Sequence, residues 1–496
     1  MNEKNLGSLE RCLKKAIGYL TNSQNEDGSW SGPLSSRIRE TFLVYTLAKE
    51  LGWKDLEKQG EKWLQSNKMR NGVNENESIL DKAIIAIYQN NPLQLTEESL
   101  YEHDIIRKTL LIYCLGIIEG SDYKIPSEYE DRKSNIKLLE KIISDSEKTI
   151  KGWSLAEFVA FRIILGQNLK IDSTEYINLL IGLKDNKDNW FQNPATTAVA
   201  LLALNFSNSL TTPETFRSFF SKNIQPDGGW SYCSLPTWDT GLSLFSIHLA
   251  SNKKYLNDNR YSEMALQYLA KFQNEDGGWG FNEHIESEAD TTSIILDALY
   301  YFPKSTTLSK KAVDYFKELQ FKSGEFKGLW PVWRKSEEPS VEVIGHIVHA
   351  LDKFNVFDLM KPRLWLKEMA KSNEWKAIWG RSLAYSIYAV VSALHPDKAS
   401  NALVTLLVKT QNKDGGWGFN KNSESNASAT GNAILALKYI DKDKYSKEIF
   451  AGVEWLVKSQ LDSGTWPQVK EVIGPRPYVY ADDSSTHNFA LIGLLR

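Results

Sequence analysis

Apolar residues recur at helical spacing along most of this 496-residue chain. Stretches such as ALQYLAKF (265–272) place apolar residues near positions i, i+3 and i+4, which is typical of an amphipathic helix with one buried face. Others, such as TTSIILDALYYF (291–302), are apolar on most faces and predict helices that other helices enclose. Alternating patterns typical of strands are scarce, so the sequence predicts an all-α protein.

A recurring turn divides the second half of the chain into repeats. Its copies are QPDGGW from Gln225, QNEDGGW from Gln273, a degenerate QFKSGEFKGLW from Gln320, QNKDGGW from Gln411 and QLDSGTW from Gln460, with an earlier QNEDGSW from Gln24. The turn ends an amphipathic helix, because Gly accepts positive φ and Asp favours turns. A more apolar segment follows each turn, so this half is predicted to hold about six pairs of helices.

The apolar second helices need enclosure, which a closed barrel supplies with the amphipathic helices outside. An open helical solenoid is the alternative. The first half is also helical, but its repeat is less regular and charged loops separate its helices. We therefore predict two α/α-barrel domains, one formed by residues 1–20 plus 211–496 and a second, barrel-like one formed by residues 21–210.

Composition narrows the class of protein. The chain has 16 Trp, 21 Tyr and 20 Phe against 5 Met, so aromatic residues either fill the core or line an apolar pocket. A net charge of −3 gives no basic surface for nucleic acid. Cys12, Cys114 and Cys233 lie too far apart to suggest a disulfide framework or a zinc site, which favours a reducing, cytoplasmic location. No signal sequence or transmembrane segment is expected.

The turn and the helix before it resemble a known motif. A Gln-x-x-x-Gly-x-Trp turn after a (Gly/Ala)-x-x-aromatic-Leu helix resembles the QW repeat of squalene–hopene cyclases and related class II terpene cyclases. The clearest copy here comprises Ala265, Tyr268, Leu269, Gln273, Gly277 and Trp279. Residues 236–250 (PTWDTGLSLFSIHLA) and 189–204 (NWFQNPATTAVALLAL) are also similar to segments of that family. The resemblance implies the βγ architecture, with the larger domain as the catalytic β domain and the smaller as the γ domain.

The family's catalytic signature, DxDD followed by Thr and a small residue, falls on residues 288–293, EADTTS. The resemblance implies that Asp290, at the position of the middle Asp, donates the initiating proton. Glu288 replaces the first Asp of the signature and Thr291 the third, with Thr292 following. The smaller bacterial cyclases of this family resemble the chain most in length.

Protonating a carbon–carbon double bond requires a strong acid in a dry site that also stabilises the resulting cation. A nearby anion, Glu288, would keep the proton on one member of an acid pair with Asp290. Thr291 and Thr292 would orient the carboxyl group by hydrogen bonding. Ordinary capping at the start of a helix is the alternative role for these hydroxyls.

The cation also needs aromatic faces, which attract cations by about 0.5–2 kcal/mol each when water is excluded. Packing in the core is the alternative role for each aromatic candidate. His346 and His487 are candidates for a hydrogen bond to Asp290 or for taking the final proton. The aromatic candidates are Trp238, Trp333, Tyr478 and Tyr480.

The resemblance implies that a diphosphate on the substrate survives the reaction, since the DDxxD-type motifs that ionise diphosphate are missing from the sequence. The nearest approach is Asp482-Asp483, which lacks the final acid. We expect Mg²⁺ to accompany the diphosphate, with Glu157 in WSLAEFVAF as the closest match to a metal-associated family Glu. Candidate phosphate-binding cations are Arg334, Lys335 and Arg476.

The sequence therefore predicts an enzyme, an intramolecular isomerase or lyase of the class II terpene cyclase type. The expected reaction converts geranylgeranyl diphosphate to a bicyclic diphosphate. The alternatives are a farnesyl diphosphate cyclase with a drimenyl-type product, and a prenyltransferase-like or non-catalytic α/α barrel that binds prenyl groups. The expected partner is the prenyl diphosphate alone, with the protein a monomer or homodimer.

Overall fold

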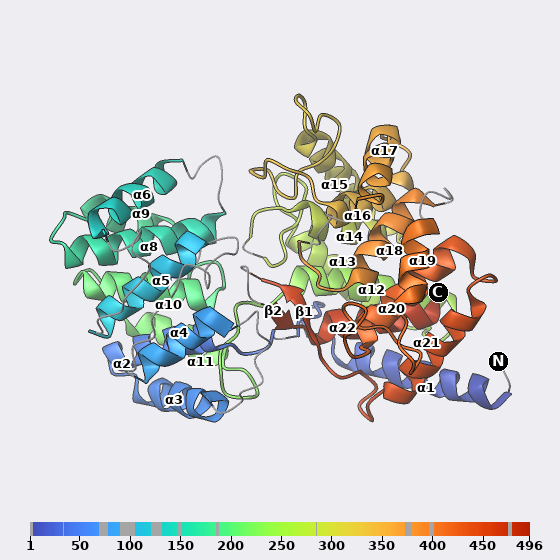
Figure 1. Ribbon diagram of the computed structural model, residues 1–496, viewed down its shortest axis with the longest axis horizontal. Helices are drawn as coiled ribbons and strands as arrows, with labels where there is room; N and C mark the ends of the chain where they lie inside the picture. The colour runs from blue at the N-terminus through green and yellow to red at the C-terminus, as the bar shows by residue number, and fades with distance from the viewer. Residues whose placement is uncertain are drawn as a thin grey trace. The chain divides into compact units, whose positions relative to one another are not determined.

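The computed structural model describes residues 3–32, 34–68, 78–89, 105–120, 131–145, 151–184, 188–283, 285–372, 378–395, 401–474 and 479–496. Its regular structure is almost entirely helical, which confirms the predicted all-α class (Figure 1). Two short strands are present, β1 (Lys470–Ile473) and β2 (Val479–Ala481). The chain forms two compact units, the first of Met1–Gly32, Ser234–Ile473 and Ala481–Arg496, and the second of Pro33–Cys233 and Gly474–Tyr480.

The first unit is a closed double ring of helices. Six inner helices follow one another around the described ring, and the first packs against the last: α12 (Pro236–Asn252), α14 (Ala289–Leu299), α16 (Val341–Asp352), α18 (Leu383–Leu394), α20 (Ala427–Asp441) and α22 (Asp483–Leu495). The outer helices are α1 (Glu3–Asn22), α13 (Arg260–Lys271), α15 (Thr306–Leu319), α17 (Met360–Met369), α19 (Asn401–Lys409) and α21 (Ser446–Ser459), with a 3₁₀ turn, η4 (Pro303–Ser305). Closure of the inner ring confirms the barrel and excludes the open solenoid for this unit.

In several repeats the recurring turn joins an outer helix to an inner helix by hydrogen bonds. At Trp279 the backbone N–H donates to Thr292 Oγ1 (2.9 Å), and the indole Nε1 donates to the carbonyl of Leu269 at the end of α13 (2.8 Å). Gly277, at φ +88°, makes the turn possible. Gln273 Nε2 donates to the Gly277 carbonyl (2.8 Å). The Trp of this turn is therefore a structural residue of the core.

The second unit contains a smaller ring. Its inner helices α2 (Ile38–Leu51), α4 (Ser78–Tyr88), α5 (Ile105–Ile118), α8 (Gly152–Asn168) and α10 (Pro194–Phe206) pack in that order, and α10 returns to α2. Around them lie α3 (Lys54–Lys68), α6 (Arg132–Ser144), α9 (Thr174–Gly182) and α11 (Glu214–Lys222). Trp190 repeats the same fastening, with its N–H donating to Thr197 Oγ1 (3.0 Å) and Nε1 to the Leu180 carbonyl (2.9 Å). This unit is therefore built from the same kind of repeat.

The unit boundaries differ from the predicted ones, which placed residues 21–210 in the second domain. Trp30 fastens to Thr240 of α12 (3.0 Å), so the first turn belongs to the first unit. Trp230 fastens to Thr41 of α2 (3.0 Å), so α11 and its turn belong to the second unit. Each unit thus keeps the turn that closes its own ring.

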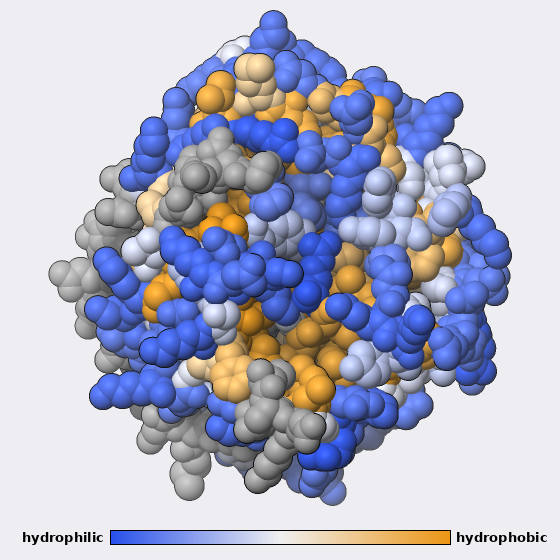
Figure 2. Space-filling view, turned by 90° about the vertical axis from the view of Figure 1, so that its right-hand side faces the viewer, coloured by the Kyte–Doolittle hydropathy of each residue, from blue (hydrophilic) through white to orange (hydrophobic). Residues whose placement is uncertain are grey.

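No helix in the described part of the chain combines the length and apolarity needed to cross a lipid bilayer. On the side of the molecule shown in Figure 2, polar residues cover most of the surface and apolar residues appear mainly in recesses between them.

Candidate active site

The predicted acid lies at the start of inner helix α14. Glu288 is the residue before the helix, in extended conformation, and Asp290 lies in the first turn. Both side chains are buried, with 5% of Glu288 and 2% of Asp290 exposed. The positive end of the helix dipole favours the negative charge that remains on a carboxyl group after it gives up a proton. A buried acid at this position is suited to giving up a proton where water is excluded.

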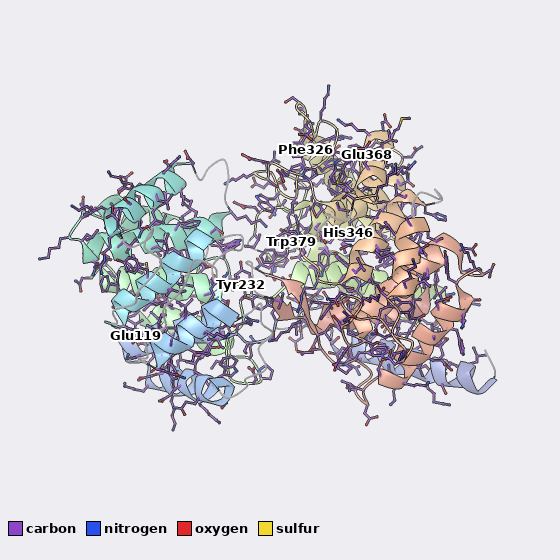
Figure 3. The ribbon with its side chains drawn as sticks, in the orientation of Figure 1. Glu119, Tyr232, Phe326, His346, Glu368 and Trp379 are labelled. Carbon is purple, nitrogen blue, oxygen red and sulfur yellow. The ribbon has the colours of Figure 1, made fainter. Side chains whose placement is uncertain are left out.

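Asp290 contacts a histidine on the neighbouring inner helix, α16. Its Oδ1 lies 2.7 Å from His346 Nδ1, within hydrogen-bond distance. His346 is itself 5% exposed, and no described residue bonds its Nε2. His346, which is labelled in Figure 3, therefore makes the contact with Asp290 that the sequence suggested. A hydrogen bond from the imidazole orients the carboxyl group and stabilises the carboxylate left after proton transfer.

The two threonines after Asp290 have different contacts. Thr291 Oγ1 donates to Glu288 Oε1 (2.9 Å), so it holds the neighbouring acid rather than Asp290. Thr292 binds the backbone of Trp279, as Thr430 does for Trp417 (2.9 Å) in a repeat without the acid. The hydroxyl of Thr292 therefore fastens the repeat, and no hydrogen bond joins it to Asp290 among the described contacts.

Aromatic side chains converge beside this acid from several inner helices. Tyr385 of α18 lies edge-on to the His346 ring at 5.2 Å and to the Phe489 ring of α22 at 5.5 Å. The predicted Trp238 packs on the same cluster, and its indole N–H donates to Ser485 Oγ (3.1 Å). Trp238 is half-buried. Tyr385 and Phe489 were missed because no motif marks them.

A second aromatic pair adjoins the acidic turn. The backbone of Trp333 pairs with that of Glu288, and its ring lies 6.5 Å from the Trp379 ring. The buried carboxylate of Glu342, on α16, accepts hydrogen bonds from the N–H groups of Ile378 (2.8 Å) and Trp379 (2.6 Å). Trp333 therefore adjoins Glu288 in this turn. Glu342 binds the loop that carries Trp379, which is labelled in Figure 3.

Other sequence candidates lie elsewhere. His487 bonds Thr465 Oγ1 (3.2 Å) and packs against Tyr19, and burial lowers its pKa to about 3. The suggested contact between His487 and Asp290 is therefore wrong. Tyr480 belongs to the second unit, where its hydroxyl donates to Glu40 Oε1 (3.0 Å).

The predicted phosphate-binding cations lie on the loop after Trp333 or outside the described residues. Arg334 is exposed and lies 3.7 Å from Asp276 of the preceding turn. Lys335 follows it and is half-buried. Tyr478 and Arg476 lie outside the described residues.

Glu157, the metal candidate, is occupied by protein contacts. Its Oε1 accepts from Arg39 (2.8 Å) and from Thr196 Oγ1 (3.2 Å), and the side chain is 2% exposed. Across the described segments, three or more His, Cys, Asp or Glu side chains nowhere gather as metal ligands would. The residues around Glu157 therefore do not fit a resident Mg²⁺ ion.

The mouth of the barrel holds further buried acids that the sequence did not single out as a site. Burial raises the pKa of both Asp239 on α12 and Asp482 at the start of α22, and each lies within reach of the other. Two carboxyl groups in contact share a proton. Glu471 of β1 accepts from Thr486 Oγ1 (3.1 Å), and burial raises its pKa to about 7. The mouth is therefore rich in acid groups of differing proton affinity.

Two family models match the chain. The model of the prenyltransferase α-α toroid domain matches residues 80–330, and that of the squalene–hopene cyclase C-terminal domain matches residues 336–490.

Two curated relatives match part of the chain. Drimenyl diphosphate synthase of Streptomyces showdoensis is 24% identical over 62% of this chain and 59% of its own length. Squalene–hopene cyclase of Zymomonas mobilis is 30% identical over 49% of this chain and 36% of its own length. The chain thus spans less than two thirds of these relatives.

Among solved structures, ent-copalyl diphosphate synthase from Streptomyces platensis matches 99% of this chain and 98% of its own, with a TM-score of 0.56 and 15% identity. At that identity the match supports the fold alone.

Proposed function

This chain belongs to the α/α-toroid family of class II terpene cyclases, and we propose that it starts the cyclisation of a linear prenyl diphosphate by protonating a double bond, with the diphosphate retained. The observation that carries the proposal is the buried contact of Asp290 with His346 at 2.7 Å, beside an aromatic cluster.

In the proposed reaction Asp290 carries the initiating proton. Its O–H bond breaks as a C–H bond forms at one carbon of an alkene, and the π electrons leave a carbocation at the other carbon. Attack by the next double bond closes each ring. Loss of a proton from the last cation forms a new alkene, so the net change is an isomerisation. His346 stabilises the carboxylate by hydrogen bonding, and Trp238 and Tyr385 offer aromatic faces to the cation.

We propose geranylgeranyl diphosphate as the substrate and a bicyclic diphosphate as the product. Farnesyl diphosphate is the second candidate, which the relative named drimenyl diphosphate synthase supports. The prenyltransferase-like alternative requires a zinc site of Asp, Cys and His. The three cysteines are separate and buried, and the described part of the chain gathers no such ligand set.

The decisive experiment compares the wild type with Asp290→Asn. Incubation with geranylgeranyl and farnesyl diphosphates, followed by dephosphorylation and product identification, should give cyclic products only with the wild type. We expect turnover to fall by about 10³-fold or more, the scale of general acid catalysis. Circular dichroism should show that the variant remains folded.

Glu286→Gln is the matched control, because this exposed acid lies in the same acidic segment, before the helix. It should retain wild-type turnover. Full activity of Asp290→Asn would place the proton donor elsewhere, and failure of the wild type to cyclise either diphosphate would contradict the proposed reaction.

A further inference from the structure

The initiating chemistry leaves several acids at the mouth of the first unit's barrel unused, and Glu471 is one of them. Glu471, on β1, is 5% exposed. Its Oε1 accepts a hydrogen bond from Thr486 Oγ1 of α22 (3.1 Å). The Ser428 hydroxyl at the start of α20 is close enough to lower the pKa of Glu471, against the larger effect of burial. The side chain therefore reaches from a strand to the amino-terminal ends of two inner helices, where α14 also presents Asp290.

Glu471 and Asp290 act on the same aromatic ring. Tyr385 contacts His346, which bonds Asp290. Burial raises the pKa of the Tyr385 phenol, and the charges of Asp290, Glu342 and Glu471 raise it further. The backbone of β1 reaches this ring as well. Val472 pairs with Gly380, and a Cβ at Gly380 would lie 2.6 Å from the Tyr385 ring. The loop that pairs with β1 therefore lies against the same ring that packs on His346, the partner of Asp290.

We propose that Glu471 is the base that ends the cyclisation, an inference that rests on the proposed function. A C–H bond beside the final cationic carbon breaks, and its electrons form the new double bond. The proton goes to a carboxylate oxygen of Glu471, which becomes a neutral acid. Solvent then removes this proton, and Asp290 is reprotonated, so no other reagent is consumed.

The other acids at the mouth are less suited to this step. Asp290 is held by His346, and Glu342 accepts two backbone N–H groups, which stabilise its charged form and weaken it as a base. Asp239 and Asp482 are fully buried against each other. Burial raises the pKa of Glu471 as well, to about 7, and this proton affinity is matched to neutral conditions.

The test is the product partition of Glu471→Gln, a neutral variant of nearly the same shape. Wild type and variant are incubated in D₂O with geranylgeranyl and farnesyl diphosphates, and the dephosphorylated products are identified by mass spectrometry. The variant should still consume substrate and incorporate deuterium at the initiating position. We expect about a tenfold or greater fall in the wild-type alkene relative to hydroxylated products and other alkene isomers.

An unchanged product partition would overturn the assignment. So would loss of all consumption in a folded variant, because Glu471 would then act in initiation. Glu471→Asp provides a second test, since it retracts the carboxylate by about 1.5 Å. Its ratio of wild-type alkene to other products should lie between those of the wild type and Glu471→Gln. If the Gln variant does not fold, the Asp variant alone tests the role of Glu471.

Failure of this inference is separable from failure of the proposed function. A wild-type protein that cyclises no prenyl diphosphate contradicts both. A wild type that cyclises, with both Glu471 variants giving its products in its proportions, contradicts only the role of Glu471.

Discussion

At the scale of single residues, neighbouring contacts explain how the chain uses a changed signature. Glu288 has one more methylene than the Asp it replaces, and Thr291, in place of an acid, donates to it (2.9 Å). The substitution leaves Asp290 with His346 as its bonded neighbour (2.7 Å). The acid therefore keeps a well-defined position although two of the three carboxyl groups of the signature have changed.

Glu471 also affects stability through its proton. Its pKa is about 7 in the folded protein against 4.5 as the ordinary value, so the folded state binds the proton more tightly than the unfolded state. Stability from this group is full below pH 4.5 and is lost as pH rises through 7. The loss is up to about 3 kcal/mol at 1.36 kcal/mol per pKa unit.

We therefore expect Glu471→Gln to match the wild type in unfolding free energy near pH 4.5 and to exceed it by up to about 3 kcal/mol at pH 8.5. Urea denaturation at the two pH values measures the difference. The exposed control Glu286→Gln should show no such pH dependence. A difference for Glu471→Gln that does not change with pH would contradict the raised pKa.

Single residues also show what the sequence could predict. Asp290 was identified from the motif, and His346 was a candidate because it lies on an inner helix. His487 is two residues after Ser485, about 200° further around α22. Ser485 bonds Trp238, whereas His487 points to Tyr19 of α1. The position of His487 at the start of an inner helix suggested a place at the mouth of the barrel. The rotation of the helix about its axis, which the sequence does not give, directs the side chain away from Asp290.

At the scale of elements, the fold depends on a repeated backbone contact between turn and inner helix. Its outer and inner helices could be predicted because the turn sequence and the apolar pattern both recur. Trp190 makes the same contact without the full turn motif. The sequence motif therefore does not reveal every repeat of the second unit. Tyr385 and Glu471 could not be placed, because their closeness depends on how the ring closes and on where the non-repeating strand β1 runs.

The contact can be tested in two matched repeats. Thr430→Val removes the acceptor of the buried Trp417 N–H and should cost about 1–3 kcal/mol of unfolding free energy. Its kcat should be unchanged, because α20 carries no acid at the position of Asp290. Thr292→Val should cost a similar amount and also lower kcat, since the turn it releases adjoins Asp290. Equal effects of both variants on kcat would contradict a special role for the turn beside Asp290.

At the scale of the whole molecule, the two units interlace along the sequence. The first 32 residues complete a ring whose other members begin at Ser234, and the second unit occupies the residues between. A division at residues 21 and 210 follows the visible repeats but separates Trp30 from Thr240 and Trp230 from Thr41, which bond across long sequence distances. Sequence periodicity located the repeats, whereas only the closed rings show which turn belongs to which unit.

The charge of the whole chain also bears on how a diphosphate is bound. The net charge is −3, so the chain as a whole carries no excess of positive charge to attract an uncomplexed diphosphate. Glu157 is paired with Arg39, and the described residues gather no metal ligand set, so we propose that Mg²⁺ arrives with the substrate rather than residing in the protein.

Chelation of Mg²⁺ should therefore raise the KM for the prenyl diphosphate several-fold, because the free diphosphate carries more negative charge toward a chain that is itself negative. The melting temperature should not change, since no structural ion is removed. Steady-state kinetics with and without chelator, beside a thermal melt under the same conditions, measure both quantities. An unchanged KM would show that the diphosphate binds without the metal. A lowered melting temperature would instead indicate a resident ion, contrary to the pairing of Glu157 with Arg39.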